Sequence, residues 1–165
     1  MISRRTFLAS SAAAMGAASL SFRGNAAESF EIMLTDAEWR SRLTPAQFAV
    51  LRKEDTERPF SNSLLGESSQ LLAESRDGTY NCAGCDLPVY QASTKFDSGT
   101  GWPSFFQAID GNVANRRDRS LFGGTRIEEH CRRCGGHLGH VFNDGPAPTG
   151  KRHCINGLAL TFTAA

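Results

Sequence analysis

Residues 131–140 read CRRCGGHLGH, and residues 82–85 read CAGC. Each segment contains a C-x-x-C pair, in which two intervening residues allow both sulfurs to point at one centre. Four thiolates from two such pairs close a tetrahedral shell around zinc, the usual form of a structural zinc site. We therefore expect one structural zinc ion bound by Cys82, Cys85, Cys131 and Cys134.

Other uses of these cysteines are open from spacing alone. Two C-x-x-C pairs can also form two disulfides or two redox pairs. A mixed site using Cys131, Cys134, His137 and His140 is a further alternative, but it would leave Cys82 and Cys85 without a role. The four-cysteine site accounts for both pairs and leaves the two histidines for other chemistry.

Residues 1–27 have the layout of an export signal. Arg4 and Arg5 precede an apolar stretch that is shorter than the roughly 20 residues a spanning helix needs, and small residues follow. We expect cleavage after Ala26 or Ala27 and a periplasmic mature protein, rather than an anchor or an ordinary amphipathic helix. The paired arginines resemble the twin-arginine signal, whose pathway carries folded proteins. Metal bound before such export would protect the thiolates in an oxidising compartment.

Length and charge predict one soluble domain after this signal. The chain has 165 residues, and we expect residues 28–165 to form a single domain with a helical part at 28–77 and a β core at 78–165. Removing the three arginines of residues 1–27 from the whole-chain charge of +1 leaves −2. A near-neutral domain has no bulk positive field for nucleic acid or anionic membrane, so we expect neither partner.

Local patterns predict short helices followed by strands. Two capping boxes, Thr35 to Glu38 and Thr44 to Gln47, mark the starts of two helices. Residues 61–77 look like a surface connection with one helical turn. From Gly78 onward, short apolar runs and turn pairs predict strands at 78–82, 87–90, 120–130, 138–142 and 158–162. The expected fold is mainly β with short N-terminal helices.

The fifth cysteine, Cys154, follows Lys151, Arg152 and His153. These cations are expected to favour the thiolate and to lower the pKa of Cys154, which would make it a nucleophile. A buried, unreactive thiol is the alternative. If the segment is a strand, alternation places Arg152, Cys154 and Asn156 on one face.

The sequence resembles the B-type methionine sulfoxide reductases, the peptide-methionine (R)-S-oxide reductases. The matching stretches are TERPF (56–60), YNCAGC (80–85), KFDSGTGWPSF (95–105), CRRCGGHLGHVFNDGPAPTGKRHCIN (131–156) and ALTF (159–162). The resemblance implies two antiparallel sheets of the methionine-R-sulfoxide reductase or Mss4-like type, N-terminal helices and a structural zinc. It also implies a monomer that reduces methionine-R-sulfoxide in proteins or peptides and so repairs oxidative damage to exported proteins.

The resemblance also implies residue roles. Cys154 matches the catalytic cysteine, which would attack the sulfoxide and become a sulfenic acid. His137 and His140 would protonate the oxygen, Trp102 and Phe142 would hold the methyl group, and Asn156 and Arg152 would orient a histidine or water and the thiolate. Without a reaction, the same fold would be a zinc-ribbon binding module. A cysteine–histidine hydrolase is a third class, but no oxyanion feature supports it.

One position departs from the family pattern. Many members carry a second reactive cysteine where this sequence has Thr100. With four cysteines on zinc and Cys154 as the nucleophile, no thiol is left to form an internal disulfide. We therefore expect a thioredoxin-like or small-thiol reductant from outside the chain.

Overall fold

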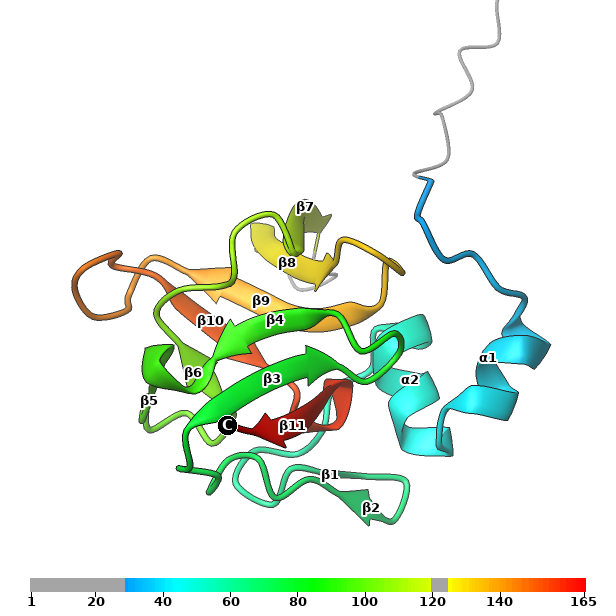
Figure 1. Ribbon diagram of the computed structural model, residues 1–165, viewed down its shortest axis with the longest axis horizontal. Coiled ribbons are helices and arrows are strands. Elements are labelled where there is room, and N and C mark those ends of the chain that lie inside the picture. The colour runs from blue at the N-terminus through cyan, green and yellow to red at the C-terminus, as the bar shows by residue number, and fades with distance from the viewer. Residues whose placement is uncertain (1–28, 120–124) are drawn as a thin grey trace, which may run out of the picture.

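The computed structural model describes residues 29–119 and 125–165, so the expected signal segment and residues 120–124 of one expected strand lie outside it. In this described part the chain is mainly β, with two short helices beside antiparallel sheets (Figure 1). This confirms the predicted fold class. Neither helix within the described ranges is long and apolar enough to cross a membrane.

The two helices are α1 (Asp36–Arg42) and α2 (Pro45–Lys53). Each begins with the predicted capping box. The threonine hydroxyl accepts a hydrogen bond from the backbone N–H three residues later, and the side chain of that later residue accepts one from the threonine backbone N–H. An N-cap of this kind contributes about 1 kcal/mol. The large apolar side chains of this helical region are buried: Trp39, Leu43, Phe48 and Leu51.

Three sheets are present among the described residues. The largest has the strand order β5-β6-β10-β9-β8-β7, and its neighbour has the order β11-β3-β4. Strands β1 and β2 form a separate small hairpin. The strands are β1 (Ser63–Leu64), β2 (Glu67–Ser68), β3 (Gly78–Cys82), β4 (Pro88–Gln91), β5 (Lys95–Phe96), β6 (Ser104–Phe105), β7 (Val113–Arg119), β8 (Thr125–Cys131), β9 (His137–Phe142), β10 (Arg152–Ile155) and β11 (Leu160–Ala164); the 3₁₀ turns are η1 (Ala92–Thr94) and η2 (Gly157–Ala159).

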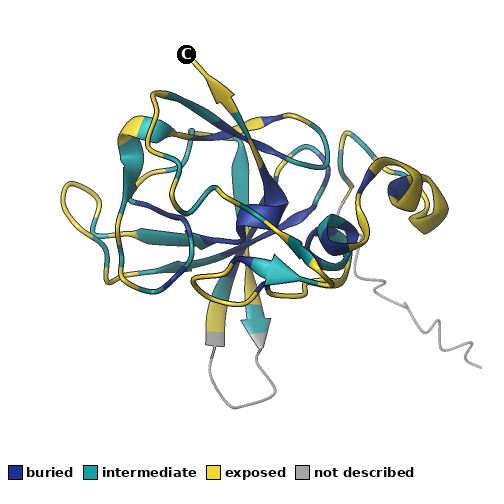
Figure 2. Cartoon of the chain, turned by 90° about the horizontal axis from the view of Figure 1, so that it is seen from below, coloured by how far each residue is buried: buried dark blue, intermediate teal, exposed yellow. Residues whose placement is uncertain are grey.

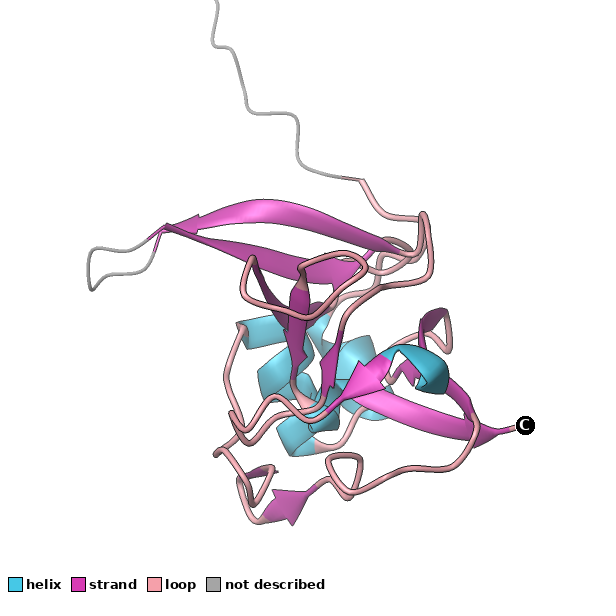
Figure 3. Cartoon of the chain, turned by 90° about the vertical axis from the view of Figure 1, so that its left-hand side faces the viewer, coloured by secondary structure: helices cyan, strands magenta, loops and turns pink. Residues whose placement is uncertain are grey.

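The structure differs from the sequence prediction at residues 61–77 and at three strands that were not predicted, β5, β6 and β7. Residues 61–77 contain the β1–β2 hairpin and a turn closed by the Ala73 N–H on the Gln70 carbonyl at 3.1 Å. Strand β7 was not predicted, because its sequence VANRRDR lacks apolar alternation. It pairs along its length with β8, and this hairpin projects beyond the rest of the sheet in Figure 3.

The core lies between the two main sheets and under helix α2. The Tyr90 and Phe105 rings, from β4 and β6, stack with centroids 4.3 Å apart and so join the two sheets. Figure 2 shows the buried positions at the centre of the molecule and the exposed ones along its outer loops. Leu51 of α2 packs onto this centre, and full burial of such a side chain contributes about 2 kcal/mol.

Candidate active site

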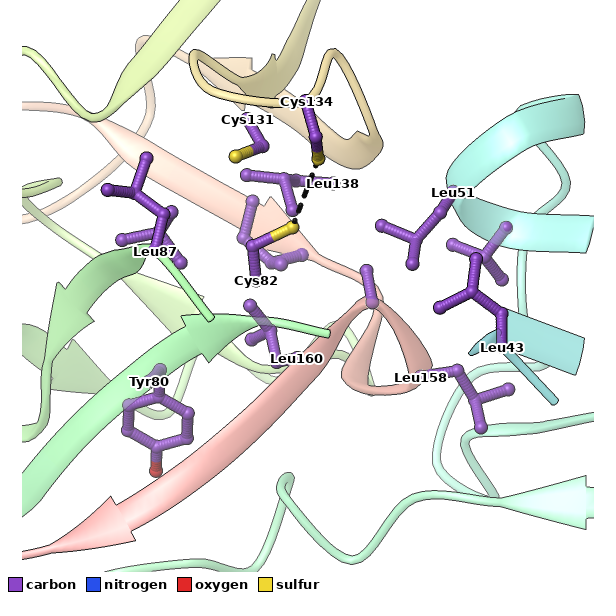
Figure 4. Close-up of a cluster of buried hydrophobic side chains, with 14 of the residues drawn as sticks. Leu43, Leu51, Tyr80, Cys82, Leu87, Cys131, Cys134, Leu138, Leu158 and Leu160 are labelled. Carbon is purple, nitrogen blue, oxygen red and sulfur yellow. Dashed lines mark hydrogen bonds between the residues drawn. The ribbon is translucent and has the colours of Figure 1, made fainter. Parts of the chain in front are cut away.

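The four cysteines of the two C-x-x-C pairs come together. Figure 4 shows three of them, Cys82, Cys131 and Cys134, within the buried cluster. The four sulfurs all lie within 4.8 Å of one another, with Cys82 to Cys134 at 3.7 Å and Cys85 to Cys131 at 3.5 Å. A tetrahedral zinc with Zn–S bonds of about 2.3 Å spaces its sulfurs about 3.8 Å apart, whereas a disulfide needs about 2.05 Å. The spacing therefore fits a metal and not a disulfide.

Helix α2 packs against the four-cysteine cluster and hydrogen-bonds to it. Arg52 of α2 donates to the Cys134 carbonyl at 3.0 Å. A Cβ at Gly136 would lie 2.9 Å from Leu51 Cδ2, so a side chain at this position would require the end of the Leu51 side chain to shift. Among the described residues, the group of ligand atoms that lie close together holds the four cysteines and neither His137 nor His140, so the mixed cysteine–histidine site is not formed.

A pocket of about 120 Å³ lies beside strands β9 and β10. Its lining residues come from segments that lie far apart in the sequence. The lining residues are Thr56, Trp102, Arg126, Gly139, His140, Phe142, Cys154 and Asn156. The predicted nucleophile, one predicted histidine and both predicted aromatic residues therefore meet at a single cavity.

Cys154 lies on β10, a central strand, with His140 opposite it on β9 and Ser104 opposite it on β6. Its sulfur is 3.9 Å from the Thr100 hydroxyl. Burial raises the pKa of the Cys154 thiol above its ordinary value of 9.0, and this outweighs the lowering effects of Thr100 and Arg152. Arg152 therefore acts as expected to lower the pKa of Cys154, but burial has the larger effect and the net pKa is raised.

Asp144 fixes the orientation of the Arg152 side chain. Two bonds of 2.9 and 2.8 Å join the guanidinium to the carboxylate, and the guanidinium lies 4.4 Å from the centre of the Phe142 ring. His153 faces the other side of the strand, where it bonds Glu129 at 2.7 Å. The predicted alternation along β10 is confirmed.

The two histidines occupy different positions. His140 lines the pocket, and its Nε2 lies 3.1 Å from Asp118, which also accepts a bond from Arg126 at 2.9 Å. Burial lowers the pKa of His140 despite Asp118, which favours the neutral ring. His137 is 2% exposed and lies behind His140, with ring centroids 5.4 Å apart.

Glu128 is the hydrogen-bond partner of the His137 ring. Its carboxylate lies 2.8 Å from His137 Nδ1 and is paired with Arg116. Burial acts to raise the pKa of Glu128, but the bonds from His137 and Arg116 together lower it. The carboxylate is therefore charged near neutral pH, and His137 Nε2 is left buried with no hydrogen-bond partner among the described residues.

Trp102 and Asn156 are both tied to Glu57. The Trp102 indole N–H donates to the Glu57 carbonyl at 3.1 Å, and the Glu57 N–H donates to the Asn156 side chain at 3.2 Å. The Asn156 amide donates to the Leu138 carbonyl at 3.0 Å. Both polar side-chain atoms of Asn156 thus bind backbone groups. Asn156 was expected to orient a histidine or a water, and it does not bind a histidine.

Sequence reasoning missed Glu57, Asp118, Arg126 and Glu128. A signal for three of them was present: opposite charges at equal sequence distances from Phe122 form the cross-strand pairs Asp118 with Arg126 and Arg116 with Glu128. Glu57 gave no such signal beyond its place in TERPF, because its partners lie about 100 residues away.

Comparisons with known proteins identify a family that the chain matches. The SelR domain family matches residues 43–164. A "Peptide methionine sulfoxide reductase MsrB" of Methanosarcina barkeri is 47% identical over 128 residues, which cover 78% of this chain and 85% of the relative. A relative with the same name from Agrobacterium fabrum is 48% identical over 129 residues, covering 78% of this chain and 90% of its own length.

Two further matches differ more in coverage. The chloroplastic peptide methionine sulfoxide reductase B1 of Arabidopsis thaliana is 47% identical over 131 residues, which are 79% of this chain and 61% of the relative. The solved "Yippee-like" domain of Mis18 has 18% identity and a TM-score of 0.45 over 55% of this chain and 98% of its own, which supports no conclusion here. The family match and the curated relatives together show that the chain belongs to the SelR-domain family, that of the MsrB peptide methionine sulfoxide reductases.

Proposed function

We propose that this protein reduces methionine-R-sulfoxide, preferably within peptides and proteins, with Cys154 as the nucleophile. The observation that carries this proposal is that Cys154, His140 and Trp102 line the same pocket. A sulfur nucleophile, a proton carrier and an apolar wall are the groups that reduction of a methyl sulfoxide requires. Family membership supports the reaction class.

The protons and bonds balance within this pocket. Neutral His140 takes the proton of the Cys154 thiol, and the thiolate attacks the sulfoxide sulfur. His140 then gives that proton to the sulfoxide oxygen while Asp118 stabilises the charged ring. The hydroxyl then passes to Cys154 as the substrate S–O bond and the S–S bond made by the attack both break, leaving methionine and a Cys154 sulfenic acid.

Trp102 and Phe142 give the pocket its apolar side. A substrate methyl group is expected to lie against this wall with its oxygen toward His140. Exchanging methyl and oxygen, as in the S epimer, would place a polar atom against carbon without a hydrogen bond. We infer that this arrangement selects the R epimer.

We further propose that an external thiol regenerates Cys154. Thr100 occupies the position beside the sulfur, and the other four cysteines form their own cluster. A first thiol displaces water from the sulfenic acid and forms a mixed disulfide, and a second thiol releases Cys154 as the free thiol. A thioredoxin-like protein or a small dithiol in the periplasm would supply both electrons.

We assign zinc to the four-cysteine cluster. Cys82, Cys85, Cys131 and Cys134 provide the soft, tetrahedral set that zinc prefers, with no room in the shell for a water. The ion would contribute stability and no step of the reaction. It would anchor the start of β9, which follows Cys134 by three residues and carries His140.

The twin-arginine layout supports export to the periplasm. Replacing both Arg4 and Arg5 with lysine should leave the protein in the cytoplasm, and fractionation of cells checks this. Recovery of the double-lysine protein outside the cytoplasm would contradict the export proposal.

The decisive experiment assays R- and S-sulfoxide peptides separately with dithiothreitol. The parent protein should reduce only the R epimer, and Cys154→Ser should reduce neither while keeping its fold by circular dichroism. Reduction by the serine variant would overturn Cys154 as the nucleophile, and equal reduction of both epimers would overturn the role of the Trp102 wall.

A further inference from the structure

Three hydroxyl groups form a continuous chain that starts at the Cys154 sulfur. Thr100 Oγ1 lies 3.9 Å from the sulfur and 2.8 Å from Ser98 Oγ. Ser98 Oγ lies 2.7 Å from Ser104 Oγ, and Ser104 donates to the Trp102 carbonyl at 3.1 Å. The chain, which we call the hydroxyl chain (Thr100, Ser98 and Ser104), is therefore hydrogen-bonded from end to end.

Strand register fixes this chain beside the nucleophile. Ser104 of β6 is the residue directly opposite Cys154, and it is fully buried. Opposite residues of an antiparallel pair project from the same face. Cys154 therefore has His140 on one flank and the hydroxyl chain on the other.

The hydrogen bonds of the hydroxyl chain can run in either direction, because either oxygen of each hydroxyl pair can be the donor. With a neutral thiol, each group donates to the next: sulfur to Thr100, Thr100 to Ser98, Ser98 to Ser104, and Ser104 to the Trp102 carbonyl. With a thiolate, the three hydroxyls can rotate so that Ser104 donates to Ser98, Ser98 to Thr100, and Thr100 to sulfur. Every hydroxyl proton has an acceptor in both arrangements.

We propose that the hydroxyl chain stabilises the Cys154 thiolate by reversing its direction when the thiol ionises, with Thr100 as the residue that touches the sulfur. The chain carries no proton away, because the Trp102 carbonyl at its end cannot hold one. The thiol proton goes to His140 on the opposite flank or to solvent. The proposal deepens the proposed function, since it rests on Cys154 as the nucleophile.

The chain matters because little else favours the thiolate. Burial raises the pKa of Cys154, and the charge of Arg152 is largely engaged by Asp144, whose own charge opposes ionisation. Two other titratable or charged groups line the pocket with Cys154: His140, which is neutral near pH 7, and Arg126, which is paired with Asp118. Hydroxyl donors linked in series polarise one another, so the last donor is stronger than an isolated threonine.

The test measures the pH dependence of Cys154 alkylation by iodoacetamide in the intact protein, followed by mass spectrometry of the Cys154 peptide. In this reaction the thiolate forms an S–C bond and iodide leaves, so the midpoint reports the pKa of Cys154 without any turnover. Thr100→Val keeps the shape and removes the hydroxyl, and it should raise the midpoint by about one unit. At fixed pH below the midpoint, both alkylation and reductase turnover should then fall about tenfold.

Two further variants separate the chain from simple packing. Thr100→Ser keeps the hydroxyl and should keep the parent midpoint. Ser98→Ala does not touch the sulfur, and it should raise the midpoint by about half a unit by removing the second link. Thermal melting identifies any variant that has lost its fold.

Unchanged midpoints in both Thr100→Val and Ser98→Ala would overturn the proposal. A shift in Thr100→Val with none in Ser98→Ala would also overturn it, because Thr100 would then act alone. If the parent protein lacks reductase activity while the expected shifts appear, the proposed function fails and the hydroxyl chain stands.

Discussion

Cys154 and His140 lie directly opposite each other on the adjacent strands β10 and β9. Both side chains line the pocket, and each belongs to a strand hydrogen-bonded on both sides within the six-stranded sheet. The distance between nucleophile and proton carrier therefore depends on sheet register and not on a loop. Such support favours catalysis, because small displacements of reacting groups are costly.

Thr100→Cys should convert the protein to one that forms an internal disulfide. The Thr100 hydroxyl lies 3.9 Å from the Cys154 sulfur, so a thiol at this position can reach it by side-chain rotation. After one turnover without reductant, the parent should lose one titratable thiol and the variant two. A variant that still reacts as a sulfenic acid would show that the two positions cannot approach.

The reactivity of Cys154 should rise steeply with pH. A thiol is neutral when protonated, so a raised pKa means that the thiolate is scarce near pH 7. The alkylation rate should increase about tenfold per pH unit and level off only above 9.0, the ordinary value for a cysteine. A plateau reached below pH 8 would contradict the dominance of burial.

Asp118→Asn should lower turnover more than substrate affinity. Asp118 binds His140 and would stabilise its charged form during the reaction. We expect kcat to fall about tenfold, a fraction of a full acid–base contribution, with KM little changed and the pH optimum displaced. Asp36→Asn, in an exposed ion pair with Lys53, is the matched control and should leave both constants unchanged.

Glu57→Gln should destabilise the protein. Three donors converge on the buried Glu57 carboxylate: the Asn62 amide and the Gly157 N–H at 2.7 Å each, and the Leu158 N–H at 2.8 Å. A glutamine places an NH₂ group against at least one of these donors. Urea unfolding should show a loss of about 2 kcal/mol, whereas Glu31→Gln at an exposed site should change stability by less than about 0.5 kcal/mol. Equal stability of the two variants would count against the role of Glu57 as an anchor.

Removal of one cluster cysteine should release the metal. Cys85→Ser breaks the four-sulfur set, and we expect elemental analysis to find one zinc per parent chain and little in the variant. The variant should also melt at a lower temperature. Cys154→Ser lies outside the cluster and should keep its zinc, so loss of metal from both variants would refute the separation of the two sites.

Features set by local sequence were the ones that could be predicted. Thr35 with Glu38 and Thr44 with Gln47 form helix starts from neighbouring residues, and both were found. The C-x-x-C pairs identify their own partners by chemistry, so the four-cysteine cluster was also found. Cys154 and Trp102 were placed through motifs that the chain shares with its family.

Features that depend on strand register could not be predicted in the same way. The charged residues of β7 are stabilised by cross-strand partners such as Glu128 and Arg126, so their strand carries no apolar signal. Glu57 reaches residues 157 and 158 only in the folded chain. The pKa of Cys154 follows burial, which a list of neighbouring cations does not reveal.

The partial burial of Cys154 limits which oxidised methionines this protein can repair. A methionine side chain is short and unbranched, and Cys154 is half-buried in the pocket that it lines with Trp102 and Phe142. The backbone of a substrate must therefore lie against the pocket rim for its sulfoxide to meet the sulfur. Sulfoxides on exposed or unfolded segments satisfy this condition, and those fixed in the interior of a folded protein do so only after that protein opens.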